Sequence, residues 1–203
     1  MRATVFSLRS VFPVGRAHRS RGAASVGGPA DVAWPIDLPG EDAPPTSIDE
    51  ARFRQVLGRF ATGVTVVTGM AGNAPVGLAV NSFTSVSLEP PLVAFCVART
   101  SRTWPLLRST GAFCVNILAD DQEALSRAFA GRPPDRFQGV GWRRGPSGNP
   151  ILSDVLAWIE CTVVAEHDAG DHVIVVGRVL DLDVGHDGRP LVFYRGGYGH
   201  FDP

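Results

Sequence analysis

The 203-residue chain contains no lysine, so all 19 of its basic residues are arginine. Without a lysine amine, no side chain is available for Schiff-base chemistry. Arginine favours fixed, two-pronged contacts with phosphate or carboxylate, although GC-rich coding alone also replaces lysine with arginine. The formal net charge is −1, which gives no electrostatic reason to expect nucleic acid as a partner.

Cysteine is also scarce. Cys96, Cys114 and Cys161 each lie in an apolar segment, and none forms a CxxC pair. An odd, widely spaced set argues against a disulfide framework and against a zinc site, so no metal is expected. This cysteine usage fits a reducing, cytoplasmic compartment. No apolar run approaches the about 18 residues of a membrane-spanning helix, so we expect no membrane association.

The common nucleotide and nucleophile motifs are missing. No GxGxxG follows a predicted strand and no GxxxxGK[ST] occurs, which excludes the usual dinucleotide-binding and P-loop readings. GxSxG and HExxH are absent as well, which argues against a serine hydrolase elbow and a zinc peptidase.

The first 30 residues carry five arginines and no acid. That composition is typical of a dispensable disordered tail, and it also fits a transit peptide or a start assigned too far upstream. Four prolines over 34–46 indicate a linker. We therefore predict a disordered tail and linker over 1–46 and a folded domain over 47–203.

The folded part reads as mainly β. Ser47 and Glu50 form a capping box before apolar residues at helical spacing, which predicts a first helix that ends near Ala61. Two more helices are predicted over 101–109 and 120–129. Strand-like segments cover 62–68, 75–87, 92–97, 112–118, 157–167, 172–184 and 191–194, and residues 131–150 read as a long loop. Strands in hairpins with few intervening helices predict an antiparallel barrel with peripheral helices.

Four segments could carry chemistry. Residues 77–91 are too polar for a core strand, and their small side chains would let a flat ring lie against the backbone. Residues 96–103 combine hydroxyls and two arginines at a helix start, which suits a phosphate. His172 begins a strand at a hairpin, and glycines in 194–198 would let the C-terminal segment pass close to a ligand. Taken singly, each could equally be a solvated edge, an ordinary cap or a turn.

Their order is more specific. Residues 54–68, 75–104, 111–118, 170–179 and 191–199 match, in sequence and spacing, the short-chain flavin reductases that serve two-component flavin-dependent monooxygenases. The resemblance covers about residues 47–201. It implies an FMN-binding, six-stranded antiparallel split β-barrel, usually a homodimer with flavin near the subunit interface.

The resemblance also implies residue roles. The flavin ring would be lined by Gly77, Leu78, Ala79, Asn81 and Ser82. Its ribityl chain and phosphate would be held by Ser85, Cys96, Val97, Thr100, Ser101 and Arg102, with Phe129 approaching the ring. A nicotinamide dinucleotide would meet His172, the candidate catalytic residue, together with Tyr194, Arg195 and Tyr198.

The activity implied is hydride transfer from NADH or NADPH to FMN or FAD, with reduced flavin passed to an oxygenase of the aromatic or steroid-ring hydroxylase type. Orientation of the two rings supplies much of the rate, and hydroxyls such as that of Ser82 would stabilise developing charge on the flavin. Arg132, Arg143 and Arg144 could hold the 2′-phosphate of NADPH or be solvated loop charges. Two alternatives remain: an FMN-dependent oxidase of the pyridoxamine-phosphate-oxidase type, and a non-enzymatic flavin-binding module.

Overall fold

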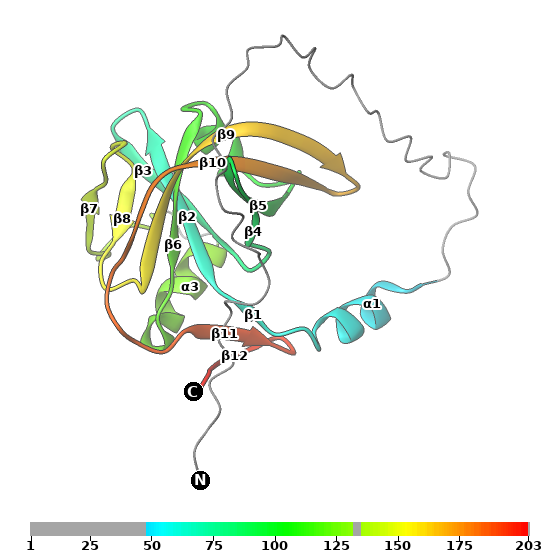
Figure 1. The fold of residues 1–203 in the computed structure, drawn as a ribbon. Coiled ribbons are helices and arrows are strands. Elements are labelled where there is room, and N and C mark those ends of the chain that lie inside the picture. Colours follow the sequence, from blue (N-terminus) through cyan, green and yellow to red (C-terminus); the bar gives the residue numbers. More distant parts are fainter. Residues whose placement is uncertain (1–47, 132–134, 203) are drawn as a thin grey trace, which may run out of the picture. The chain divides into compact units, whose positions relative to one another are not determined.

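Strands dominate the computed structural model, which describes residues 48–131 and 135–202 (Figure 1). The predicted tail over 1–46, Ser47 and Arg132 lie outside the described residues. The main sheet has seven strands, all paired antiparallel, in the order β3-β2-β6-β9-β10-β5-β4. Its strands are β2 (Thr65–Ala71), β3 (Ala74–Val80), β4 (Thr84–Leu88), β5 (Pro91–Ala98), β6 (Ala112–Ile117), β9 (Ala157–Ala169) and β10 (His172–Val184). The predicted mainly β, antiparallel class is confirmed, with seven strands in the sheet where six were expected.

The additional strand arises because the segment 75–87, predicted as one strand, is two. β3 and β4 stand at opposite ends of the strand order, yet only residues 81–83 separate them in the chain. Four residue steps span at most roughly 14 Å, so the sheet must curl until its two ends are near each other. No ladder joins β3 to β4 among the described residues, which leaves a curled sheet split at this point.

Two small sheets complete the strands. β1 (Thr62–Gly63), β11 (Leu191–Tyr194) and β12 (Gly197–His200) form one, and β7 (Trp142–Arg144) pairs with β8 (Pro150–Leu152) in the other. Three of these strands were not predicted: β7 lies in the expected loop 131–150, β8 begins at the last residue of that loop, and β12 lies in the glycine-rich C-terminal segment. Arg195 and Gly196 have φ of 52° and 80°, which allows the tight turn between β11 and β12.

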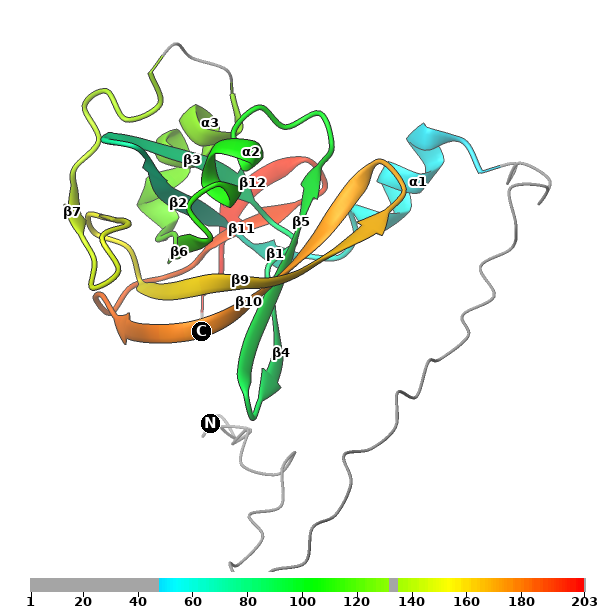
Figure 2. The ribbon, with the colours of Figure 1, turned by 90° about the horizontal axis from the view of Figure 1, so that it is seen from above.

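The helices are short: α1 (Glu50–Leu57), α2 (Trp104–Arg108) and α3 (Glu123–Ala130), the last preceded by the 3-10 turn η2 (Asp120–Gln122). The N-cap of α1 is Asp49, whose carboxylate accepts a hydrogen bond from the Arg52 N–H, so the predicted cap at Ser47 is wrong. The helix ends at Leu57, with Gly58 as its C-cap, earlier than the predicted end near Ala61. Figure 2 shows α2 and α3 beside β3. Within the described ranges, no helix has the length and apolar character to cross a membrane.

Aromatic and polar contacts order the core. Phe95 meets Trp104 and Phe113 edge to face, with ring centroids 5.5 and 5.4 Å apart. Asn116 is fully buried; its amide donates to the Val66 carbonyl at 3.1 Å and its oxygen accepts from the Leu152 N–H at 2.8 Å. These bonds satisfy two backbone groups that have no access to water.

Two of the three cysteines belong to this core. Cys114 and Cys161, the core cysteines, are fully buried, whereas Cys96 is half-buried and unpaired like them. Burial, reinforced by the neighbouring Glu160 carboxylate, raises the pKa of the Cys161 thiol to about 12 and that of Cys114 further still. The core cysteines are therefore unreactive thiols, and Cys96 is the accessible one.

Candidate functional site

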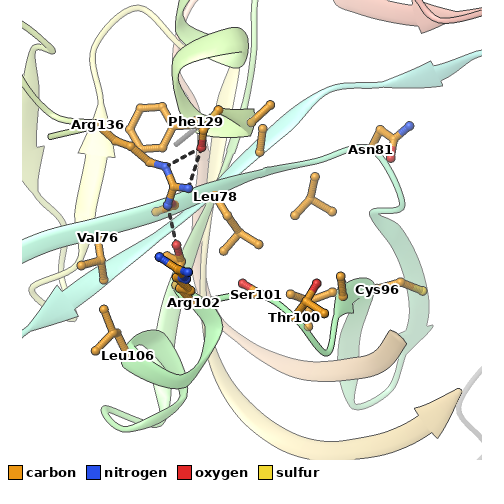
Figure 3. Close-up of a pocket in the computed structure, with 18 of the residues that line it drawn as sticks. Val76, Leu78, Asn81, Cys96, Thr100, Ser101, Arg102, Leu106, Phe129 and Arg136 are labelled. Carbon is orange, nitrogen blue, oxygen red and sulfur yellow. Dashed lines mark hydrogen bonds between the residues drawn. The ribbon is translucent and has the colours of Figure 1, made fainter. Parts of the chain in front are cut away.

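A cavity of about 620 Å³ opens where the sheet is split, between β3, β5, the end of α3 and the start of β10 (Figure 3). Its size lies within the usual range of small-molecule sites. Twelve of the predicted site residues line it: Gly77, Leu78, Ala79, Asn81, Ser82, Cys96, Val97, Thr100, Ser101, Arg102, Phe129 and His172. Four segments far apart in sequence therefore meet in one pocket.

The wall at Gly77 depends on the absence of a side chain. A Cβ atom at Gly77 would lie 2.7 Å from Cε1 of Phe129, closer than atoms in contact can be. The Phe129 ring thus packs directly on the backbone of β3, and it stands edge-on to Phe137 at 5.0 Å between centroids. This contact fixes the distance between α3 and β3 and with it the width of the pocket.

Ser82 joins the connection that follows β3, at one end of the sheet, to β5, the strand beside β4 at the other end. Its hydroxyl oxygen accepts a hydrogen bond from the Cys96 N–H at 2.8 Å, and its hydroxyl donates to the Cys96 carbonyl at 3.2 Å. In this arrangement the hydroxyl is engaged with β5 and holds the 81–83 connection in place. Its predicted role in stabilising charge on a bound ring stays a prediction.

The part of the pocket formed by the segment after β5 is polar. Thr100, Ser101 and Arg102 follow β5, and Figure 3 shows Ser101 and Arg102 on one side of the cavity. The Ser101 oxygen accepts from the Trp104 N–H at 3.1 Å, so its hydroxyl proton can still be donated to a ligand. A guanidinium and several hydroxyls at one place are the donors that a phosphate prefers.

Arg136 also lines this end, and sequence reasoning missed it. Its Nη2 and Nε donate to the Gly131 carbonyl at 2.7 and 3.3 Å, and its Nη1 donates to the Gly77 carbonyl at 3.1 Å and to the Thr103 hydroxyl. The available signal was its place in the long loop 131–150. Two of the arginines singled out there lie elsewhere: the Arg143 guanidinium lies 5.7 Å from the ring centroid of Trp158, and neither Arg143 nor Arg144 lines the pocket.

His172 reaches the pocket from the β9–β10 hairpin. Arg99 anchors that hairpin: its Nε donates to the Gly170 carbonyl at 2.9 Å and its Nη2 lies 2.6 Å from Asp168 Oδ1. Nδ1 of His172 lies 2.7 Å from Asp171 Oδ1. This hydrogen bond, and then the charge of the imidazole, hold the pKa of Asp171 below its ordinary value.

Four predicted site residues lie outside the pocket lining. Ser85 is exposed on β4, and Tyr194 and Arg195 stand at the β11–β12 turn. Tyr198 lines a second hollow of about 190 Å³ that shares Ala79, Val80, Asn81 and Ala130 with the main pocket.

Tyr198 also contacts α3. Its hydroxyl lies 2.9 Å from the Ser126 hydroxyl, and the Arg127 guanidinium lies 4.8 Å from its ring centroid. Since α3 carries Phe129, the C-terminal hairpin supports a wall of the pocket from behind.

Comparison with known proteins agrees with this geometry. Residues 57–202 match the family model described as flavin reductase like domain. The chain belongs to this family.

Sequence relatives and solved structures match most of the chain. The flavin-dependent monooxygenase reductase subunit HsaB of Rhodococcus jostii is 48% identical over 157 residues, which cover 77% of this chain and 80% of HsaB. The FMN reductase (NADH) SmoA of Agrobacterium fabrum is 41% identical over 84% of this chain and 97% of its own. The NADH:FAD oxidoreductase SgcE6 of Streptomyces globisporus, solved with NAD and FAD fragments, superposes with a TM-score of 0.72 at 37% identity, covering 76% of this chain and 94% of SgcE6.

The pocket residues fit a flavin. The aliphatic wall of Leu78 and Ala79 suits a flat ring, the close Gly77–Phe129 contact leaves β3 without a protruding side chain there, and the polar end suits a phosphate. Two chemically different halves in one cavity are what a molecule with an apolar ring and a charged tail requires.

Proposed function

We propose that this chain is a flavin reductase that oxidises NADH, reduces FMN or FAD by hydride transfer and supplies reduced flavin to a partner monooxygenase. The observation that carries the proposal is that one pocket combines an aliphatic wall on β3 with an end lined by hydroxyls and arginine after β5. A bound flavin supplies the two-electron acceptor for the hydride of a dihydronicotinamide.

The chain's own residues would bind and orient. Leu78 and Ala79 would hold the ring against β3, while Thr100, Ser101 and Arg102 would hold the phosphate by charge-assisted hydrogen bonds. Much of the rate would come from holding the two reactants in register, so a dedicated general base is not required.

His172 would orient the dinucleotide. The Asp171 carboxylate accepts a hydrogen bond from Nδ1 of His172. The other ring nitrogen of His172, Nε2, is therefore left for a ligand in the pocket. NADH is the proposed donor since SmoA and SgcE6 are both named for NADH. Arg143 and Arg144 lie outside the pocket lining, which gives no support to their holding a 2′-phosphate.

The proposed partner is a flavin-dependent oxygenase that receives reduced flavin by diffusion. HsaB is named as the reductase subunit of a flavin-dependent monooxygenase, which supports an oxygenase as the partner. We also propose a cytoplasmic homodimer. Three unpaired cysteines suit a reducing compartment. Apolar side chains are exposed on α1 (Phe53, Val56) and at the end of β10 (Leu182, Val184). Contact with a second copy of the chain would bury them, which supports a dimer. Light scattering at several concentrations tests the dimer.

Steady-state NADH oxidation, followed by near-ultraviolet absorbance with and without FMN or FAD, tests the activity. Turnover should depend on added flavin. The His172→Asn variant should raise the KM for NADH more than that for flavin. The matched control is His167→Asn, an exposed histidine of the same hairpin outside the pocket, and it should behave like the unmodified protein.

Other results would favour the alternatives. Oxygen consumption by bound FMN without any nicotinamide would indicate an oxidase of the pyridoxamine-phosphate-oxidase type. Flavin binding without NADH oxidation would indicate a flavin-binding module and overturn the proposed activity.

A further inference from the structure

We propose that the pocket continues past its polar part into a shelf for the adenine ring of FAD, formed by Val76 and Leu106, so that this chain prefers FAD over FMN. The inference rests on the proposed function, because it takes the pocket as the flavin site. It names the better of the two flavins, a choice that relatives named for FMN and for FAD leave open.

Val76 and Leu106, the adenine shelf, come from two walls of the same pocket. Val76 lies on β3 and Leu106 on α2, two elements that stand side by side (Figure 2). Val76 precedes Leu78 by two residues, so both side chains lie on the same face of β3, roughly 7 Å apart along the strand. Leu106 is 46% exposed, which leaves apolar surface that a ligand can bury.

The character of the pocket changes along its length from apolar to cationic and back to apolar. Figure 3 shows Asn81 and Cys96 at one end, Leu78 and Ser101 in the middle, then Arg102, and the adenine shelf on the far side of Arg102. FAD has the same order, because a charged diphosphate joins its two planar rings. FMN ends at its phosphate and would leave the adenine shelf uncovered.

NADH also carries an adenine ring, and the position of the shelf favours the flavin nucleotide. Val76 shares its strand face with Leu78, which the proposed function places against the flavin ring. His172, which would orient the dinucleotide, enters from β10, where it pairs with Ala98 of β5. The shelf therefore continues the wall that holds the flavin and not the strand pair that carries His172.

Isothermal titration calorimetry with FMN and with FAD, in the absence of nicotinamide, tests the inference. Leu106→Ala shortens the shelf, and it should not threaten the fold because Leu106 is exposed on a helix and alanine is a good helix former. Val76→Thr keeps the branched shape and replaces a methyl group with a hydroxyl. Leu180→Ala is the matched control, since Leu180 is a leucine of β10 that is 51% exposed and lies outside the pocket.

We expect the unmodified protein to bind FAD about fivefold or more tightly than FMN, as burial of part of one leucine side chain implies. Leu106→Ala should remove most of this preference and Val76→Thr part of it, in both cases by weakening FAD alone. Leu180→Ala should retain the preference in full.

Three results would overturn the inference. The first is equal affinity for FMN and FAD in the unmodified protein, or a preference that both shelf variants leave unchanged. The second is equal weakening of both flavins by Leu106→Ala, which would show a structural effect. The third is a raised KM for NADH in Leu106→Ala with unchanged FAD affinity, which would assign the shelf to the adenine of NADH.

Failure of the proposed function looks different. If the unmodified protein binds neither flavin, or binds both and oxidises no NADH, the proposed function fails. If it binds both flavins equally and oxidises NADH with either, only the adenine shelf is lost.

Discussion

Replacing Gly77 with alanine tests the contact that sets the width of the pocket. The added methyl would lie 2.7 Å from Cε1 and 3.1 Å from Cδ1 of Phe129, and 3.0 Å from the Val67 carbonyl oxygen. Phe129 is 1% exposed, packed against Phe137 and part of the pocket lining, so displacing its ring either breaks the Phe137 contact or narrows the pocket. Either the ring or the strand must move.

The expected cost follows from two opposing effects. Overpacking a well-packed contact costs about 1–3 kcal/mol of unfolding free energy. Alanine is favoured over glycine within a strand by roughly 0.5–1 kcal/mol, because it has less backbone freedom to lose on folding. The net loss should lie between about 0 and 2.5 kcal/mol, centred near 1 kcal/mol, and it should be accompanied by weaker flavin binding as α3 is displaced from β3.

Urea denaturation without flavin measures the change in unfolding free energy, and fluorescence titration with FMN measures the change in flavin affinity. Gly63→Ala is the matched control, because Gly63 also lies in a strand and no atom lies within 4 Å of its Cβ position. Gly63→Ala should raise the unfolding free energy by roughly 0.5–1 kcal/mol, because only the backbone effect operates there, and should leave FMN affinity unchanged. If Gly77→Ala is as stable as the unmodified protein and binds FMN equally well, the close contact does not shape the pocket.

Three further predictions concern the core, the thiols and the hairpin. Asn116→Ala should lower the unfolding free energy by about 2–4 kcal/mol in urea melts, because two buried backbone groups lose their partner; a loss well below this range would mean that water replaces the amide. A thiol-specific chromogenic reagent should modify Cys96 alone in the folded protein, and saturating FMN should protect it; labelling of the core cysteines, or no protection, would contradict this. His172→Ala should raise the pKa of Asp171 toward its ordinary value in an NMR titration. The stability that this lowered pKa provides, complete above the ordinary value and lost as the pH falls through the folded-state value, should then disappear; an unchanged pKa of Asp171 would assign its shift to another cause.

Much of the fold could be predicted from local pattern. The two long strands that became β9 and β10, and the turn between them, followed from β-branched residues around Asp168–Asp171. The small residues from Gly77 and the hydroxyls from Thr100 predict ligand-binding segments, and the structure brings both segments to one cavity.

The remainder depended on tertiary structure. No local signal says that β3 and β4 occupy opposite ends of a sheet, because that follows from their pairing with β2 and β5. β12 has alternate glycines instead of an apolar face, and its pairing with β11 supplies the stability that its sequence does not. Arg136 belongs to no sequence motif, and its hydrogen bonds to the Gly77 carbonyl and the Thr103 hydroxyl join residues that are far apart in the chain.

The central claim is that the pocket on β3 lets NADH reduce a bound flavin. The most direct measurement is anaerobic: the visible absorbance of oxidised FMN or FAD is followed after mixing with NADH, with catalytic amounts of this protein and without it. The account predicts rapid bleaching that requires the protein and consumes one NADH for each flavin. Flavin absorbance that persists in the presence of the protein and excess NADH would contradict it.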